Sequence, residues 1–239
     1  MDGFFLIDKP AGMTSHDVVA SVRRLLQQSA PPPPERRARL RVGHAGTLDP
    51  FATGLLIIGV GNTTKVLAGV AKLPKTYEAE LTLGATSTTD DREGEIRPSS
   101  VTRVPSTADV RRALETLTGT LLQVPPAYSA VKIRGVPAYR RARRGESVAL
   151  PARPVTVFEA HLLLFAYPHV RIRWAVSSGT YARALTRDLG ERLGVGAYLK
   201  RLRRTAIGPW LVGHAVRLDQ LSVGALRPSA ALDRADHAE

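Results

Sequence analysis

The chain has 239 residues, of which 44% are hydrophobic, and its 34 Lys and Arg outnumber its 21 Asp and Glu to give a formal net charge of +13. This composition excludes a disordered or fibrous chain, and the absence of cysteine excludes disulfides, thiolate nucleophiles and metal sites built on cysteine. The positive charge indicates a polyanionic partner, with nucleic acid as the leading class and a generally basic composition as the alternative.

The sequence offers no segment for a membrane or for export. No apolar run approaches the roughly 18 residues that a helix needs to span a bilayer. The first residues, MDGFFLIDKPAGMT, carry an acid where a signal peptide carries positive charge. We therefore expect a cytoplasmic protein without membrane association.

The first predicted elements are a strand and a helix. Residues 4–7 form a short apolar run that predicts a strand, and a Lys-Pro turn follows at residues 9–10. Apolar residues then recur at helical spacing over residues 18–26, with Thr14 or Ser15 available as the N-cap.

Four prolines, Pro31 to Pro34, end this helix. They predict a surface loop of the polyproline type, which is either an idle insertion or an arm that touches RNA.

Strands predominate in the rest of the chain, and helices interrupt them. Strands are predicted at 55–61, at 75–89 with one solvated face, at two places within 155–180, and at 198–210 as a basic strand or turn. Helices are predicted at 63–73, 107–119 and 180–194. Because the elements lack the regular alternation of a doubly wound fold, we expect a mixed, largely antiparallel central sheet with flanking helices, an α/β protein of the α+β type.

The stretch from Arg41 to Val60, RVGHAGTLDPFATGLLIIGV, holds a single carboxylate, Asp49. Pro50 favours an extended backbone at Asp49, and the nearby glycines permit tight turns or the close approach of another molecule. Taken alone, this pattern leaves two interpretations open. Asp49 caps the next segment or forms an Asx turn, or it is a catalytic acid on a shaped loop.

Five strings spread over residues 3–212 carry a family resemblance: LIDKPAGMTSHD, GHAGTLDPFATGLL, KTYEAELTLG, VPPAYSAVK and SSGTYARALTRDLGERLG. In order and character they resemble the bacterial tRNA pseudouridine synthase B family, and GHAGTLDPFATG is the most specific of them. The resemblance implies the pseudouridine synthase fold. It also implies a reaction in which a uridine within RNA has its C1′–N1 bond broken, after which the uracil turns and is rejoined through C5 without a cofactor.

Two residues match the family's catalytic groups. The aspartate that matches Asp49 is essential in the family, either for attack on the sugar or base or for removal of the C2′ proton, and both roles need an ionised carboxylate. The arginine that matches Arg183 pairs with that carboxylate, which would lower its pKa and orient it.

Four further residues match positions around the target nucleotide. Tyr77 and Tyr181 match tyrosines that line the uracil pocket, and Leu202 matches a position that contacts the flipped nucleotide. His44 matches a histidine that inserts into the RNA loop in place of the flipped base. Without the resemblance, the pattern around Tyr77 is also that of a core tyrosine in a strand. The pattern around His44 is also that of a core histidine or a general base.

Basic residues predict where RNA is held. A Pro- and Arg-rich segment at about 124–150 resembles the family's RNA-gripping loop, and a second basic cluster, KRLRR, lies near Leu202. The predicted RNA-binding residues are Lys65, Arg134, Arg140, Arg141, Arg143, Arg144, Arg203 and Arg204. We interpret Lys9 and Pro10 as structural support for the pocket.

No catalytic metal is predicted. The histidines are far apart, and the acidic turn DDREGE lacks the ligand spacing of a calcium loop. This turn reads as a solvated hairpin, although Asp91 matches a family aspartate near the active cleft.

The expected organisation is a catalytic domain at residues 1–218 and a short, poorly ordered tail at 219–239, without the C-terminal RNA-binding domain that relatives often carry. The expected partner is the T-arm of tRNA, with uridine 55 as the target by resemblance. We expect a monomer with no obligatory protein partner.

Two rival functions remain at this point: a non-catalytic tRNA-binding or tRNA-folding protein of the same fold, and a synthase that acts on another RNA with partner subunits. The presence of Asp49, Tyr77, Tyr181 and Arg183 together favours an enzyme over a binding protein.

Overall fold

The computed structural model describes residues 1–29 and 40–233. They form two compact units, Met1–Thr76 with Arg203–Glu239, and Tyr77–Leu202. Both chain crossings between the units fall inside strands, within β4 (Lys75–Leu83) and β12 (Ala197–Ile207). No linker composition marks such a boundary, which is why residues 1–218 read as one domain from the sequence.

The first unit is built on two long antiparallel strands, β1 (Gly3–Lys9) and β3 (Thr53–Val60), paired from Gly3↔Val60 to Lys9↔Gly54. Two shorter strands extend this pair: β2 (Val42–His44) pairs with β3, and β14 (Val216–Arg217) pairs with β1. The C-terminal part of β12 also pairs with β3, and β13 (Trp210–Leu211) pairs with β12. The predicted strand at residues 4–7 is confirmed, and it is buried on both faces.

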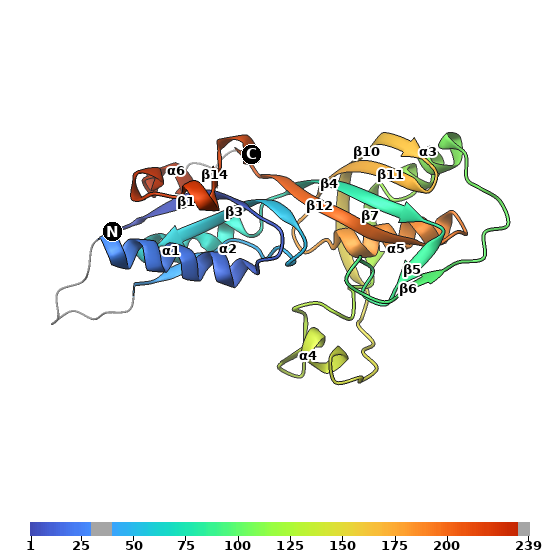
Figure 1. The fold of residues 1–239 in the computed structure, drawn as a ribbon, viewed down its shortest axis with the longest axis horizontal. Coiled ribbons are helices and arrows are strands. Elements are labelled where there is room, and N and C mark those ends of the chain that lie inside the picture. The colour runs from blue at the N-terminus through green and yellow to red at the C-terminus, as the bar shows by residue number, and fades with distance from the viewer. Residues whose placement is uncertain (30–39, 234–239) are drawn as a thin grey trace. The chain divides into compact units, whose positions relative to one another are not determined.

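Alternate side chains of β1 and β3 supply two core clusters. Phe5 and Ile7 face α1 (Ser15–Ser29), whose buried stripe is Val18, Val19, Val22 and Leu26. Phe4 and Leu6 face the opposite cluster, where Phe4 meets Trp210 edge to face at 6.3 Å between ring centroids. Figure 1 shows α1 lying along the sheet of its unit. Each fully buried aliphatic or aromatic side chain stabilises such a core by about 1.5–3 kcal/mol.

Helix α1 begins at a side-chain cap, as predicted. Thr14 Oγ1 accepts a hydrogen bond from Asp17 N at 3.1 Å, and Asp17 Oδ2 accepts one from Thr14 N at 2.8 Å. This reciprocal pair satisfies amide groups that the helix itself leaves without partners. Of the two residues offered as the cap, Thr14 fills the role. The Pro31–Pro34 segment lies outside the described residues.

The helix predicted at residues 63–73 is two short pieces, a 3-10 turn η2 (Gly61–Lys65) and α2 (Leu67–Val70), joined at Val66. Its apolar spacing is real, because Leu67 and Val70 are buried. The single-helix expectation was wrong, and the break at Val66 limits each piece to about one turn.

The second unit contains a sheet in the order β12-β4-β11-β10-β7. The additional strands are β7 (Gly119–Gln123), β10 (Arg153–Ala166) and β11 (His169–Val176), and β10 pairs antiparallel with both of its neighbours. Along β4, every second side chain from Lys75 to Leu83 is buried, as the alternation predicts. The mixed, largely antiparallel sheet expected from the sequence is confirmed.

Helices α3 (Thr107–Glu115) and α5 (Ala182–Arg192) belong to this unit, and α3 packs against β10 and α5. Two small hairpins complete it, β5 (Ala85–Ser87) with β6 (Ile96–Pro98), and β8 (Lys132–Ile133) with β9 (Val136–Pro137), the latter followed by α4 (Ala138–Ala142).

The segment expected to be a poorly ordered tail has defined structure as far as it is described. Phe4 and Arg227 exchange two backbone hydrogen bonds of 2.9 and 2.8 Å. Short helices surround this contact: η3 (Val212–His214), η4 (Leu218–Gln220), η5 (Val223–Ala225) and α6 (Ala230–Asp233). Within residues 1–29 and 40–233, no helix is both long and apolar enough to cross a membrane.

Candidate active site

The predicted site residues are divided between the two units. The first unit holds Asp49, His44, Lys65, Arg203 and Arg204, and the second holds Tyr77, Tyr181, Arg183, Leu202 and the arginines of residues 124–150.

Asp49 lies on the loop that joins β2 to β3. Leu48 and Phe51 on either side are 3% exposed and anchor the loop in the core, whereas Asp49 is only half-buried. The carbonyl of Asp49 accepts a hydrogen bond from Ala52 N at 3.1 Å, which closes a turn over Pro50. The loop therefore presents the carboxylate from a fixed backbone.

The side chain of Lys9 holds the Asp49 loop at Pro50. This side chain is completely buried, and Nζ donates to the carbonyls of Pro10 at 2.8 Å, Met13 at 2.7 Å and Pro50 at 3.2 Å. The same Pro50 carbonyl accepts from Gly12 N at 2.9 Å. An ammonium group has three donors, and a buried one needs such partners. Lys9 thus supports the backbone beside Asp49, and the support of a substrate pocket by Lys9 and Pro10 stays a prediction.

Ser15 holds the residue before Asp49. Its hydroxyl accepts from Leu48 N at 2.8 Å and lies 3.2 Å from Leu48 O, to which it donates. Ser15 is itself buried in the first turn of α1. One side chain thus satisfies both backbone groups of the residue adjacent to the candidate acid.

Arg204 clamps the loop from β12. Its side chain is 1% exposed, and it donates to Leu55 O at 2.8 Å, Gly46 O at 3.1 Å and Thr47 O at 3.3 Å. The prediction that Arg204 contacts RNA was wrong, because the side chain is buried and its donors are directed at backbone carbonyls of its own unit. Gly54 allows the close approach of this strand: a Cβ there would lie 2.8 Å from Arg204 N and still nearer its carbonyl oxygen.

The other candidates of this unit lie nearer the surface. Arg203 donates to both carboxylate oxygens of Asp8, at 3.0 and 2.7 Å, and Lys65 is exposed at the end of η2. His44 ends β2, and its Nδ1 is buried without a hydrogen-bond partner among the described residues. Burial, assisted by the positive charges of Arg204 and His16, holds the pKa of His44 below its usual value, so the ring is neutral at pH 7.

In the second unit, Tyr77 and Leu202 are largely buried, with exposed fractions of 9% and 7%. Tyr77 lies on the face of β4 that also carries Ala79, Leu81 and Leu83. The exposed fraction alone fits either a strand-core tyrosine or the wall of a base pocket.

Arg183 lies in the first turn of α5 and is 5% exposed. It donates to Tyr128 O at 3.0 Å and Thr89 O at 3.3 Å, and its NH1 lies 3.5 Å from Asp91 Oδ2. Asp91 is equally buried, and its Oδ1 accepts from Thr89 Oγ1 at 2.6 Å and Glu93 N at 2.9 Å. Asp91 therefore holds a guanidinium group that would be costly to bury alone.

The acidic turn is consequently an anchor for arginines rather than a solvated hairpin. Arg187 donates to Asp90 at 3.0 Å, to Asp188 at 3.0 Å and to Val124 O at 2.9 Å. Burial raises the pKa values of Asp90 and Asp188, and the positive charge of Arg187 opposes both shifts. Asp90 also adopts a positive φ of 61°, which aspartate tolerates better than most residues.

Tyr181 is held by a residue that no sequence pattern singles out. Gln123 Oε1 accepts from Tyr181 N at 2.8 Å, and Gln123 Nε2 donates to Tyr181 O at 3.3 Å. Gln123 is 1% exposed and ends β7. The two residues are 58 positions apart, so no local motif links them.

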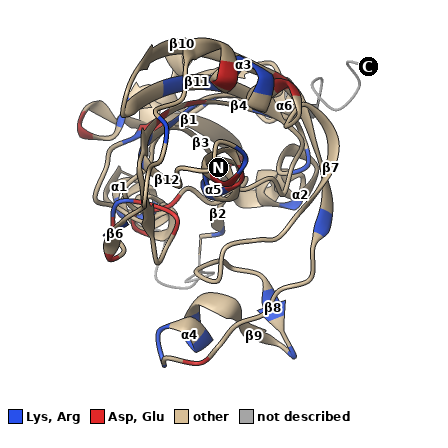
Figure 2. Cartoon of the chain, turned by 90° about the vertical axis from the view of Figure 1, so that its right-hand side faces the viewer, with Lys and Arg blue, Asp and Glu red and all other residues tan. Residues whose placement is uncertain are grey.

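The segment at about 124–150 extends away from the sheet of its unit, and Figure 2 shows Lys and Arg residues along it. Arg134, Arg140, Arg143 and Arg144 are exposed, and Arg134 has a φ of 49°. Arg141 is paired with Glu146 at 2.5 Å, and the Arg143 guanidinium lies over the Tyr139 ring at 5.6 Å. The segment offers a basic surface with an aromatic ring, a combination suited to RNA.

Comparison with known proteins agrees with this description. The model of the TruB family pseudouridylate synthase N-terminal domain matches residues 35–182, and the tRNA pseudouridylate synthase B C-terminal domain model matches residues 183–234. The tRNA pseudouridine synthase B of Thermobifida fusca is 49% identical over 92% of this chain and 74% of its own length. That of Corynebacterium efficiens is 44% identical over 98% and 76%.

Among solved structures, the crystal structure of a Cbf5-Nop10-Gar1 complex contains a chain that superposes with a TM-score of 0.68 at 28% identity. The match covers 91% of this chain and 52% of that one, so this chain spans about half the length of its solved relative.

The sheet, the Asp49 loop and these matches define a pseudouridine synthase. Within that class, the chain belongs to the TruB family.

Proposed function

We propose that this chain converts a uridine of tRNA, position 55 of the T-loop, to pseudouridine, with Asp49 as the catalytic carboxylate. The support for the substrate is that the relatives with the cited identities are named tRNA pseudouridine synthase B. The observation that carries the role of Asp49 is the clamped loop, in which three buried side chains, Lys9, Ser15 and Arg204, hold the backbone on both sides of one half-buried acid.

The reaction needs little more than such an acid. The bond from C1′ to N1 breaks, a bond from C1′ to C5 forms, the proton leaves C5, and N1 gains a proton, so no atom is lost and no redox partner is required. A carboxylate serves either by attacking the sugar or base or by removing the C2′ proton. In both cases its position decides the rate, since a small displacement of a reacting group slows an enzyme by orders of magnitude.

The two tyrosines are proposed to receive the base. Extruding a nucleotide from its stack costs a few kcal/mol, and stacking on one aromatic ring contributes about 1–3 kcal/mol. Tyr77 on β4 and Tyr181 at the start of α5 are both held by regular structure, and Tyr181 is further held by Gln123. Contacts with Leu202 and insertion of His44 into the RNA loop would offset the rest of the cost.

Arg183 is proposed to orient the Asp49 carboxylate and keep it ionised. Its backbone partners and Asp91 fix the guanidinium in place. A guanidinium group carries five N–H donors in a planar fork, a geometry that suits carboxylates. The exposed arginines of residues 124–150, with Lys65 and Arg203, are proposed to hold phosphates of the tRNA. The protein is proposed to act as a cytoplasmic monomer.

Tritium release from tRNA labelled at C5 of uridine tests the proposal, because the C5 proton leaves only when the base is rejoined. We expect Asp49→Asn to abolish release while tRNA affinity, measured by filter binding, stays within about tenfold, since phosphate contacts supply most of the affinity. Glu115→Gln, which removes an exposed carboxylate on α3, is the matched control and should retain full release. Release by the Asp49→Asn variant at the wild-type rate would remove Asp49 from the mechanism, and no release by the wild type would favour a binding protein.

A further inference from the structure

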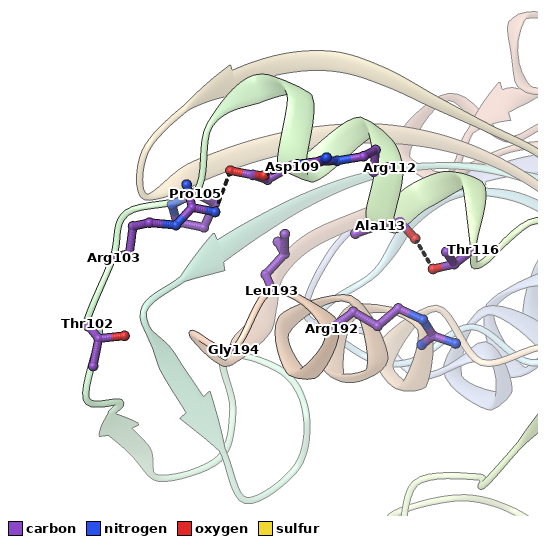
Figure 3. A pocket seen from close by; sticks show the side chains of 10 residues that line it. All are labelled: Thr102, Arg103, Pro105, Asp109, Arg112, Ala113, Thr116, Arg192, Leu193 and Gly194. Carbon is purple, nitrogen blue, oxygen red and sulfur yellow. Dashed lines mark hydrogen bonds and ion pairs between the residues drawn. The ribbon is translucent and has the colours of Figure 1, made fainter.

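A pocket of about 590 Å³ lies in the second unit beside α3 and the end of α5. Figure 3 shows the residues that line it, from the loop before α3, from α3 itself and from the last turn of α5. Arg183 and Arg192 are nine residues apart, which is about 14 Å along a helix. The pocket is therefore at the opposite end of α5 from Arg183 and is not part of the site described above.

The charges in the pocket favour an anion. Three guanidinium groups, those of Arg103, Arg112 and Arg192, line the pocket together with one carboxylate, that of Asp109. Asp109 is already committed: Oδ2 accepts from Ser106 N at 2.9 Å, Ser106 Oγ at 2.8 Å and Arg103 at 2.9 Å, and Oδ1 accepts from Arg112 at 2.6 Å. The bonds from Ser106, followed by that from Arg112, also hold the pKa of Asp109 far below its usual value.

Asp109 thus has a structural role that leaves the arginines available. It completes the N-terminal cap of α3 and orients two guanidinium groups that are 73% exposed. Arg103 and Arg112 each use an NH2 group on Asp109, and Arg192 uses NH1 on Asp188 O at 3.3 Å. Among residues 1–29 and 40–233, no further hydrogen-bond partner is found for these three side chains, so each retains donors for a ligand.

The rest of the lining combines the hydroxyl groups of Thr102 and Thr116 with apolar side chains. Pro105, Ala113 and Leu193 are apolar, and Figure 3 shows the Leu193 side chain between α3 and the end of α5. Guanidinium donors beside an apolar wall match a phosphate attached to a ribose.

We infer that this pocket binds a backbone phosphate of the RNA substrate, outside the nucleotide that reacts. The inference rests on the proposed function for the identity of the RNA. Its physical basis is independent of the chemistry at Asp49, because a guanidinium pair held by Asp109 recognises phosphate by charge and geometry alone.

The test compares neighbouring arginines of α3. Arg112→Gln changes a pocket residue, and Arg111→Gln makes the same charge change on an exposed residue of the same helix that does not line the pocket. Filter binding of a tRNA transcript between 50 and 200 mM salt gives the slope of log K against log salt for each variant. We expect Arg112→Gln and Arg103→Gln to weaken binding and to reduce the magnitude of that slope by about 0.7–0.9, the value for one phosphate. Arg111→Gln should behave as the wild type.

Several readouts separate the possible outcomes. In the tritium-release assay, Arg112→Gln should raise the KM for tRNA more than it lowers kcat, because the pocket holds RNA away from the reacting atoms, and Arg111→Gln should leave both unchanged. If Arg112→Gln and Arg111→Gln bind tRNA alike, the inference is overturned while the proposed function stands. If the wild-type protein releases no tritium and Arg112→Gln still weakens tRNA binding, the proposed function is wrong, while the inference that the pocket binds an RNA phosphate is supported. If AMP shifts the amide NMR signals of Thr116 and Gly194 and tRNA does not, the ligand is a free nucleotide and the RNA assignment is wrong.

Discussion

Gln123 and Tyr181 are joined by two hydrogen bonds in which the side-chain amide pairs with both backbone groups of the tyrosine, at 2.8 and 3.3 Å. The arrangement imitates one rung of a β-ladder at the point where α5 begins, and Tyr181 O also accepts from Leu185 N at 3.1 Å in the first turn of that helix. Because Tyr181 is the N-cap residue of α5 and Arg183 follows two residues later, Gln123 sets the position of both candidate site residues.

Gln123→Met is expected to slow turnover more than it weakens tRNA binding. The substitution removes the Gln123 acceptor of Tyr181 N and one donor to Tyr181 O, which also accepts from Leu185 N at 3.1 Å. The loss of a buried hydrogen-bond partner costs about 1–3 kcal/mol of stability. Gln123→Glu is the matched variant, because it keeps an acceptor for Tyr181 N, removes the amide donor to Tyr181 O and adds a carboxyl group at a position that is 1% exposed. Urea unfolding and the kinetics of tritium release should place both variants below the wild type. Equal kinetics in all three would mean that Tyr181 does not need this support.

Arg204→Met is expected to destabilise the first unit by about 1–3 kcal/mol, since the buried carbonyl of Leu55 loses its donor, whereas the more accessible carbonyls of Gly46 and Thr47 can turn to water. Arg201→Met is the matched control: it lies on the same strand but is exposed, and its contact with Glu80 is 3.7 Å long. Exposed ion pairs contribute at most about 1 kcal/mol. Urea unfolding of both variants measures the difference. If Arg204→Met changed the salt dependence of tRNA binding and left stability intact, Arg204 would be an RNA contact after all.

The contrast between Arg203 and Arg204 shows what the sequence can and cannot predict. Both lie in KRLRR, and a basic run reads as a surface for phosphates. A strand directs successive side chains to opposite faces, so one arginine reaches Asp8 and the other enters the interior. Sequence patterns predicted the longer strands β1, β3, β4, β10, β11 and β12, α1 and its cap, α5 and the Asp49 loop, because these depend on local spacing. The shorter strands, such as β2 and β7, were missed. Gln123, the Asp91–Arg183 pair and the role of Arg204 depend on contacts between distant positions, which local patterns do not encode.

Arg183→Met is expected to lower the rate of tritium release by at least about 100-fold, the usual effect of removing one preorganised donor from an active site. The same change leaves the Asp91 carboxylate buried without its guanidinium partner, which costs about 3–5 kcal/mol where a buried pair is broken. Stability and catalysis must therefore be separated by measuring the rate per folded molecule.

Two further variants make that separation. Arg183→Lys keeps the charge but not the fork of donors, and it should recover part of the rate. In Asp91→Asn, the amide oxygen can still accept the hydrogen bonds from Thr89 Oγ1 and Glu93 N. This variant should therefore lower stability more than it lowers the rate. An Arg183→Met protein with wild-type rate and an unchanged pH–rate profile would exclude the proposed role for this residue.

His44 is expected to remain neutral at pH 7, because burial first, then the positive charges of Arg204 and His16, hold its pKa below 6.5. The unfolded chain binds a proton at His44 more readily than the folded one. The stabilising contribution of neutral His44 is therefore fully present above about pH 6.5 and is lost as the pH falls through the lower pKa of the folded state. An NMR titration of the His44 ring proton, assigned with His44→Phe, should give a midpoint below 6.5. The free energy of unfolding should fall less between about pH 7 and pH 5 in His44→Phe than in the wild type. An identical fall in the two proteins, or a midpoint above the usual value, would show that the ring is not held in its neutral form and that Arg204 does not act on it through charge.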